Sequence, residues 1–121
     1  MANTFKVINF AAEPNSAGTP FTMYTVASST TTVVLGLILA NIHSSAVTAE
    51  VELVSTTSNR AGANNASNGT SFLVKDVNIP TGSSLEVLSG GKVVLEAGDK
   101  IQIDCSVADK LSGTLSIMEI T

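Results

Sequence analysis

The sequence predicts an all-β fold: a single antiparallel β-sandwich with jelly-roll or Greek-key connections that spans residues 1–121. Apolar and polar side chains alternate in several short segments, and this period of two is typical of half-buried strands. Turn-forming residues separate these segments every 8 to 13 residues or so. No segment has the pattern of an amphipathic helix. We therefore expect eight or nine short strands around one core, with strands too unlike one another for propeller blades or a solenoid.

The segment that organises the chain is residues 30–41, whose residues 33–40 are continuously apolar. Its opening is rich in β-branched residues, which favours a strand over a helix. The pattern predicts a strand that is buried on both sides or bent at Gly36. The apolar run is far shorter than the roughly 20 residues of a membrane-spanning helix, and no basic N-terminus precedes it. We expect neither a membrane span nor a signal peptide.

Two strands are predicted before this central segment. The first covers residues 4–10, with Phe5 and Val7 on one face, and the second covers residues 21–27. Prolines, asparagine and glycine between them predict a loop over residues 11–20, because these residues favour turns.

Clear alternation returns after the central strand. Residues 46–55 place Val47, Ala49, Val51 and Leu53 on one face and Thr48, Glu50 and Glu52 on the other. Residues 56–69 are small and polar and predict the longest loop. A tight turn is expected at residues 96–99, with Gly98 at a position of positive φ. Further strands are predicted over residues 70–79, 84–88, 92–95, 100–107 and 114–120.

The composition predicts a weakly charged, hydroxyl-rich surface, since charged residues make up 13% of the chain and tryptophan is absent. Such a surface is poorly protected against association. Two explanations stay open: obligate assembly, or the ordinary use of Thr and Ser on the outer faces of strands. The net charge is −4, and the six basic residues are scattered. Because a phosphate backbone is neutralised by clustered Lys or Arg, we expect no nucleic-acid binding.

Cys105 is the single cysteine, and it lies in the apolar alternation of residues 101–107. It can form neither an internal disulfide nor a cysteine-based metal cluster, so we expect a small core residue. A single cysteine without an internal disulfide partner also favours assembly inside a cell.

Few residues suggest catalysis. His43 is the only histidine, and the neighbouring Ser44 and Ser45 lack the surroundings of a nucleophile, so a structural or surface role is expected. Glu50 and Glu52 share a strand face and could act as an acid/base pair or hold a metal. A solvated face is the simpler interpretation, because no second carboxylate-rich segment is evident.

Three further acidic residues, Asp99, Asp104 and Asp109, are spaced by five and match no metal-binding loop. We expect them to cap turns or face solvent. The Gly90-Gly91-Lys92 run lacks the spacing of a phosphate-binding loop. We therefore expect no enzyme activity, no catalytic residues, no cofactor and no metal.

Two passages resemble small β-sandwich structural proteins of tailed bacteriophages, especially marine cyanophages. The first is YTVASSTTTVVLGLILAN at residues 24–41, followed by SAVT at 45–48. The second combines LVKDVNIP at 73–80 and SSLEV at 83–87 with KVVLEAGDKI at 92–101. The resemblance covers most of the chain from Tyr24 to Ile120, and it implies no catalytic residues.

This resemblance implies a non-enzymatic virion structural protein, with a capsid decoration (cement) protein as the first expectation. Its partners would be the major capsid protein or neck and tail proteins, and it would act as a homo-oligomer located in the virion after assembly in the host cytoplasm. A neck, tail or fibre accessory protein is an alternative. A receptor- or glycan-binding module is another, although the scarcity of aromatic residues counts against it. An enzyme would require His43, Glu50 and Glu52 to converge.

The expected contacts with neighbouring molecules lie in the N-terminal arm, residues 1–20, and in the loop of residues 56–69. Disorder of both segments is the alternative. The candidate interface residues are Phe5, Phe10, Phe21, Arg60, Asn64, Asn65 and Asn68.

Overall fold

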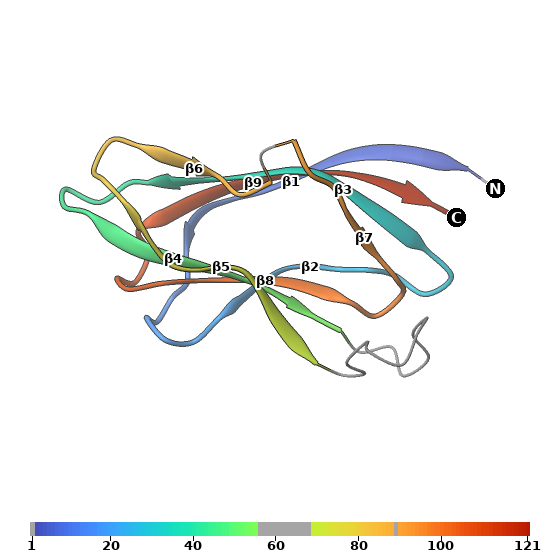
Figure 1. Cartoon of the computed structure of the whole chain (residues 1–121), viewed down its shortest axis with the longest axis horizontal. Coiled ribbons are helices and arrows are strands. Elements are labelled where there is room, and N and C mark those ends of the chain that lie inside the picture. The colour runs from blue at the N-terminus through green and yellow to red at the C-terminus, as the bar shows by residue number, and fades with distance from the viewer. Residues whose placement is uncertain (1, 56–68, 89) are drawn as a thin grey trace.

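The protein folds as two antiparallel sheets packed face to face, as seen in the computed structural model in Figure 1. The structure describes residues 2–55, 69–88 and 90–121. Nine strands and no helix are found in this part of the chain, which confirms the predicted all-β sandwich. No helix among these residues is long and apolar enough to cross a membrane.

Each sheet combines strands that are distant in the sequence. Sheet A has the order β1-β9-β3-β6, with β7 also paired to β3. Its strands are β1 (Asn3–Glu13), β3 (Thr31–Asn41), β6 (Ser84–Glu86), β7 (Val93–Leu95) and β9 (Leu111–Ile120). Sheet B has the order β2-β8-β4-β5. Its strands are β2 (Phe21–Thr25), β4 (Val47–Val54), β5 (Thr70–Ile79) and β8 (Lys100–Cys105).

The strand order is that of a jelly roll, one of the two predicted connection types. β6 pairs with residues 38–40 of β3 and β7 with residues 32–34, so the two short strands line one edge of β3 end to end. When they are counted as one strand, the chain gives eight strands that pass repeatedly between two four-stranded sheets. β1 then lies at the opposite edge of sheet A, where among the described strands it pairs with β9 alone.

The core lies between the sheets and is made by one face of each. β4 shows the predicted alternation: Val47, Ala49 and Val51 are buried, while Glu50 points to the opposite side. Cys105 is 3% exposed and belongs to this core, as predicted. The largest fully buried side chains are those of Leu37, Leu39, Ile79, Leu95, Ile101, Ile103, Leu111, Leu115 and Ile117.

The central strand differs from its prediction in one respect. The register of β3 against β9 shifts between Val34 and Gly36, which confirms an irregularity at the glycine. Burial on both sides is wrong, because Leu35 and Ile38 are exposed on the face away from the core. An apolar run predicts two covered faces, but sheet B covers only one.

The predicted loop over residues 11–20 is partly strand. β1 continues to Glu13: the register shifts between Phe10 and Glu13, and Glu13 pairs with Leu111, the first residue of β9. A bulge allows a strand to continue past residues that break its regular pairing. Most of the segment predicted as an N-terminal arm is therefore a paired strand of sheet A.

The turn between β7 and β8 forms as predicted. The Asp99 N–H donates to the Glu96 carbonyl (3.0 Å), and Gly98 has φ 88°. Glycine adopts this left-handed conformation without steric cost. The turn is docked on the β2–β3 connection, because the Gly98 N–H donates to the Val26 carbonyl (3.0 Å) and the Val26 N–H to that of Asp99 (2.9 Å).

Candidate functional site

The predicted interface residues fall into three groups. Phe5 is 72% exposed on β1. Phe10 and Phe21 are half-buried against the core, with their rings edge to face and their centroids 5.3 Å apart. Arg60, Asn64, Asn65 and Asn68 lie outside the described residues. Among the three described members of the set, Phe5 is the one whose side chain is largely exposed and available for contact.

Phe5 belongs to a row of apolar side chains that crosses sheet A. Phe5 pairs with Met118, Met118 with Val33, and Val33 with Val94. Directly paired residues project from the same face of a sheet, so the row runs from β1 through β9 and β3 to β7. Phe5 and Val94, its two ends, are 72% and 61% exposed. The row lies on the side of sheet A away from sheet B, which we call the outer face of sheet A.

The outer face of sheet A is almost without charge. Val7, Leu35 and Ile38 are also exposed on it, and Glu86 of β6 lies at its edge. The outward residues of the two central strands include no Asp, Glu, Lys or Arg; they are Thr31, Val33, Leu35, Ile38 and Ala40 on β3 and Ser112, Thr114, Ser116, Met118 and Ile120 on β9. The apolar row that crosses this uncharged face marks an interaction site more often than isolated exposed residues do.

The outer face of sheet B has the opposite character. Glu50 and Glu52 project from β4, as predicted, and the Lys75 ammonium of β5 lies 3.0 Å from a Glu50 oxygen. The same ammonium lies 4.6 Å from the centre of the Phe72 ring. The Lys75 side chain is 54% exposed, and an ion pair open to solvent in this way adds little stability.

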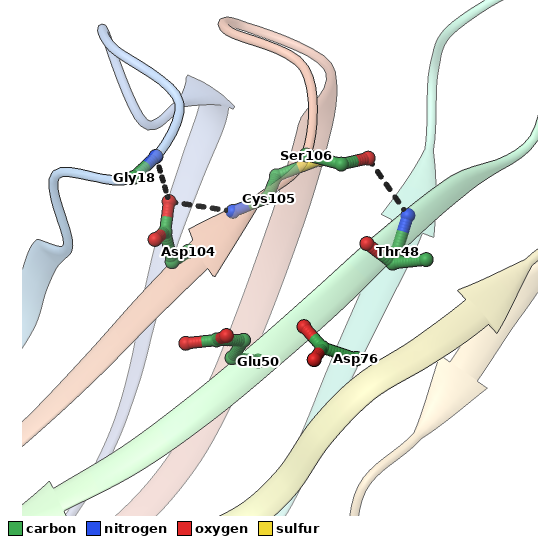
Figure 2. Close-up of a pocket in the computed structure, with 7 residues that line it drawn as sticks. All are labelled: Gly18, Thr48, Glu50, Asp76, Asp104, Cys105 and Ser106. Atoms are coloured by element: carbon green, nitrogen blue, oxygen red, sulfur yellow. Dashed lines mark hydrogen bonds between the residues drawn. The ribbon is translucent and has the colours of Figure 1, made fainter.

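A shallow pocket of about 190 Å³ opens on sheet B beside these charges (Figure 2). Glu50, Asp76 and Asp104 bring carboxylates from three strands to it. Its other lining residues are Gly18, Thr48, Cys105 and Ser106. Sequence reasoning missed this convergence, because Asp76 and Asp104 reach Glu50 only through the pairing of β4 with β5 and β8.

The hydrogen bonds at this pocket connect parts of the fold to one another. One oxygen of Asp104 accepts hydrogen bonds from the N–H of Gly18 (3.1 Å) and of Cys105 (2.8 Å), so Asp104 anchors the β1–β2 loop to β8. Burial, and then the charges of Glu50 and Asp104, raise the pKa of nearby Glu52. In the described ranges, no group of three or more His, Cys, Asp or Glu side chains is arranged to hold a metal ion.

The three residues that an enzyme would require to converge, His43, Glu50 and Glu52, do not meet in this pocket. His43 follows β3, where its N–H donates to the side-chain oxygen of Asn41 (2.7 Å) and its carbonyl accepts from the Thr81 hydroxyl (2.7 Å). It does not line the pocket that contains Glu50. Asp99 accepts from the Glu96 N–H (3.0 Å), and this turn-capping role is the one predicted for it.

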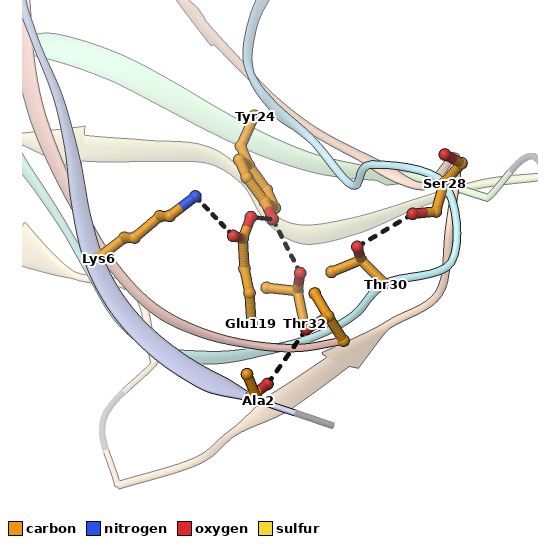
Figure 3. A network of polar contacts seen from close by, with 8 residues as sticks. Ala2, Lys6, Tyr24, Ser28, Thr30, Thr32 and Glu119 are labelled. Atoms are coloured by element: carbon orange, nitrogen blue, oxygen red, sulfur yellow. Dashed lines mark hydrogen bonds and ion pairs between the residues drawn. The ribbon is translucent and has the colours of Figure 1, made fainter.

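A polar network connects the two sheets near the chain termini (Figure 3). The Tyr24 hydroxyl of β2 donates to Glu119 of β9 (2.6 Å) and shares a hydrogen bond with the buried Thr32 hydroxyl of β3 (2.8 Å). The other Glu119 oxygen lies 2.7 Å from the Lys6 ammonium of β1. The network therefore joins three strands of sheet A to the edge of sheet B.

The network changes the proton affinity of two of its members. Burial, and then the hydrogen bond to Glu119, raise the pKa of Tyr24 to about 12. The hydrogen bonds from Lys6 and then from Tyr24 lower the pKa of Glu119. Alternation in the sequence could place Glu119 and Lys6 on inward faces, but it carried no signal that these residues and Tyr24 would meet.

No family model and no curated protein matches the sequence. A solved structure described as "Bacillus endospore appendages form a novel family of disulfide-linked pili" is similar to it in fold, with 16% sequence identity and a TM-score of 0.47. The alignment covers 99% of this chain and 87% of that chain. A likeness this distant supports no statement about function.

Proposed function

We propose that the protein is a non-enzymatic structural component of a tailed-phage virion, which binds the assembled capsid as a decoration protein. The assignment to a tailed-phage particle is supported by the resemblance to phage structural proteins of residues 24–41, 45–48, 73–80, 83–87 and 92–101. The outer face of sheet A carries the proposal, because its two central strands present no charged side chain outward. The jelly roll by itself is no argument, since one fold serves many functions.

The outer face of sheet A suits docking onto a preformed lattice. Its strands are held by pairing within the sandwich, so binding requires no refolding of the chain. Apolar side chains such as Phe5 and Val94 are already exposed, so their removal from water on binding contributes favourable free energy. Many copies on one particle would add avidity, so the contact of each copy can be modest.

Binding to the particle tests the proposal directly. Purified protein is mixed with virions from which it has been removed, and co-sedimentation is measured. We expect saturable binding, and we expect Val94→Lys to weaken it at least tenfold because the substitution buries an unpaired charge in the contact. Asn78→Lys is the matched control, since it adds the same charge at an exposed site on sheet B.

Two outcomes would contradict this assignment. Absence of the protein from purified virions by mass spectrometry would overturn the virion role. Equal loss of binding by both lysine variants would show that the outer face of sheet A is not the docking face. Cryo-electron microscopy of the particle then locates the protein: density on the capsid supports decoration, whereas density at the neck, tail or fibres would replace it with the accessory role.

A further inference from the structure

The free edge of β1 is the feature that carries a further inference. The N–H and carbonyl groups of Ala2 and Thr121 bond each other in both directions (3.1 and 3.0 Å). Hydrogen-bonded pairs alternate along an antiparallel ladder, so Thr4, Lys6 and Ile8 direct their backbone groups toward β9. Asn3, Phe5, Val7 and Asn9 therefore direct theirs away from the sheet, where the described part of the chain provides no partner strand.

The other sheet edges are protected against pairing. β2 is five residues long and has a register shift between Thr22 and Tyr24. β6 and β7 have three residues each. β5 is long, but its Lys75 and Asp76 are charged, Asp76 has φ 51°, and the register against β4 shifts at these residues. Short, bulged and charged edges resist association, whereas β1 keeps a regular register from Asn3 to Phe10.

The residues on this edge are self-complementary. Along the outer face, β1 presents Asn3, Phe5, Val7 and Asn9: a polar residue, two apolar residues and a polar residue. We propose that β1 pairs antiparallel with β1 of a second copy about a two-fold axis at Lys6. Phe5 then lies opposite Val7 of the second copy, and Asn3 lies opposite its Asn9. All four pairs are of the hydrogen-bonded type, so each exchanges two backbone hydrogen bonds.

The charge at the axis is compensated within each copy. The two Lys6 side chains face each other, and like charges in that position normally oppose pairing. Each Lys6 ammonium, however, lies 2.7 Å from a Glu119 carboxylate of its own chain. The axis therefore joins two neutral pairs rather than two isolated cations.

The pairing joins the two A sheets into one continuous sheet with a single outer face. An edge of seven residues is about 23 Å long. A single pair of edge strands buries less surface than the interface of a stable dimer, which buries about 800 Å² per partner. We therefore expect a weak dimer in solution that avidity strengthens on a particle. The inference rests on the proposed function only for the use of this dimer, and its test needs no particle.

Disulfide trapping tests the register. Opposed residues that are not hydrogen-bonded lie about 4.5 Å apart at their Cα atoms, a distance that a disulfide can span. Lys6→Cys is therefore expected to form a covalent dimer under mild oxidation. Thr4→Cys on the same strand is the matched control, because its partner would be Ile8 and two copies of Thr4 stay far apart. Cys105 is buried and does not interfere.

Sedimentation equilibrium at protein concentrations up to about 1 mM measures the dimer without a crosslink. Val7→Pro removes an N–H that faces the free edge, and we expect it to weaken dimerisation at least tenfold. Val94→Lys, on the same outer face but at the far edge of sheet A, is expected to leave the dimer intact. Circular dichroism verifies that both variants fold.

The outcomes separate the two proposals. A monomer at every concentration, or equal crosslinking of Lys6→Cys and Thr4→Cys, overturns the β1 pairing and leaves capsid binding untouched. Loss of the dimer in Val94→Lys but not in Val7→Pro also overturns it, in favour of association through the outer face. Species that grow beyond the dimer would show an open contact between unlike edges and would overturn the two-fold axis.

Discussion

At the scale of single residues, Gly113 shows how closely the sheet edge is packed. Gly113 pairs with Phe10, and a Cβ atom added to it would lie 2.3 Å from the ring of that phenylalanine. The ring therefore occupies the space that a side chain would need. A glycine in a strand usually weakens it, but here the close approach of the ring requires one.

Gly113→Ala is expected to lower the free energy of unfolding by about 1–3 kcal/mol, because the Phe10 ring must move from its contacts with the core. Urea unfolding measures the change. Gly36→Ala in the adjacent strand is the control, since nothing lies within 4 Å of its added Cβ, and it should be close to neutral. A neutral Gly113→Ala would show that the ring can relocate freely.

Tyr24 allows a direct test of the network between the sheets, because it is the only tyrosine and the chain has no tryptophan. Its ultraviolet absorbance should titrate with a midpoint near 12 in the folded protein, against about 10 in denaturant. Glu119→Gln should lower the midpoint by removing the carboxylate beside the phenol. Glu86→Gln, an exposed site on β6, should leave it unchanged.

The same pKa shifts predict how the contribution of this network to stability depends on pH. The raised pKa of Tyr24 means that its contribution is complete below about pH 10 and is lost as the pH rises toward 12. The lowered pKa of Glu119 acts in the other direction: its contribution is present above the ordinary glutamate pKa and is lost as the pH falls through the folded value. Tyr24→Phe should flatten the alkaline loss of stability, as measured by thermal unfolding across pH.

At the scale of elements, the Asn41 side chain makes three hydrogen bonds that hold the connection from β3 to β4. The Asn41 amide donates to the carbonyls of Ser45 and Ile79 (both 2.9 Å), and its oxygen accepts from the His43 N–H. Asn41 is 6% exposed, so water cannot replace these bonds fully. It therefore fixes the β3–β4 turn and ties that turn to the end of β5.

Asn41→Ala should destabilise the protein by about 2–4 kcal/mol, because it leaves buried backbone groups without partners. Asn78→Ala on β5, where the side chain is exposed, should change the stability little. Urea unfolding compares the two variants. Equal, small effects would mean that the turn is held by its backbone alone.

At the scale of the whole molecule, the two outer faces differ in chemistry while they enclose one core. Sheet A faces outward with Phe5, Val33 and Val94, and sheet B with charges such as Glu50 and Lys75. A sandwich needs only its inner faces for stability, so the outer faces are free to differ. The molecule therefore has one apolar outer face, which is suited to contact, and one charged outer face, which is suited to solvent.

The buried thiol of Cys105 reports on the stability of this whole unit. Burial raises its pKa, so the reactive thiolate is scarce in the folded state. Labelling by a thiol reagent should therefore require unfolding, and Gly113→Ala should accelerate it about tenfold for each 1.4 kcal/mol of lost stability. Labelling at one rate in both proteins would instead indicate access through the pocket that Cys105 helps to line.

The sequence alone determined the fold class, the strand positions within a few residues, the inward face of β4 and the burial of Cys105. These are local properties: a period of two fixes which side chains share a face, and turn residues fix where a strand ends. Only the tertiary structure decided which strands are neighbours. It brought Tyr24 to Glu119, gathered Glu50, Asp76 and Asp104, and aligned the apolar row on sheet A. Those meetings depend on strand order and register, which the packing of distant segments sets and no local pattern encodes.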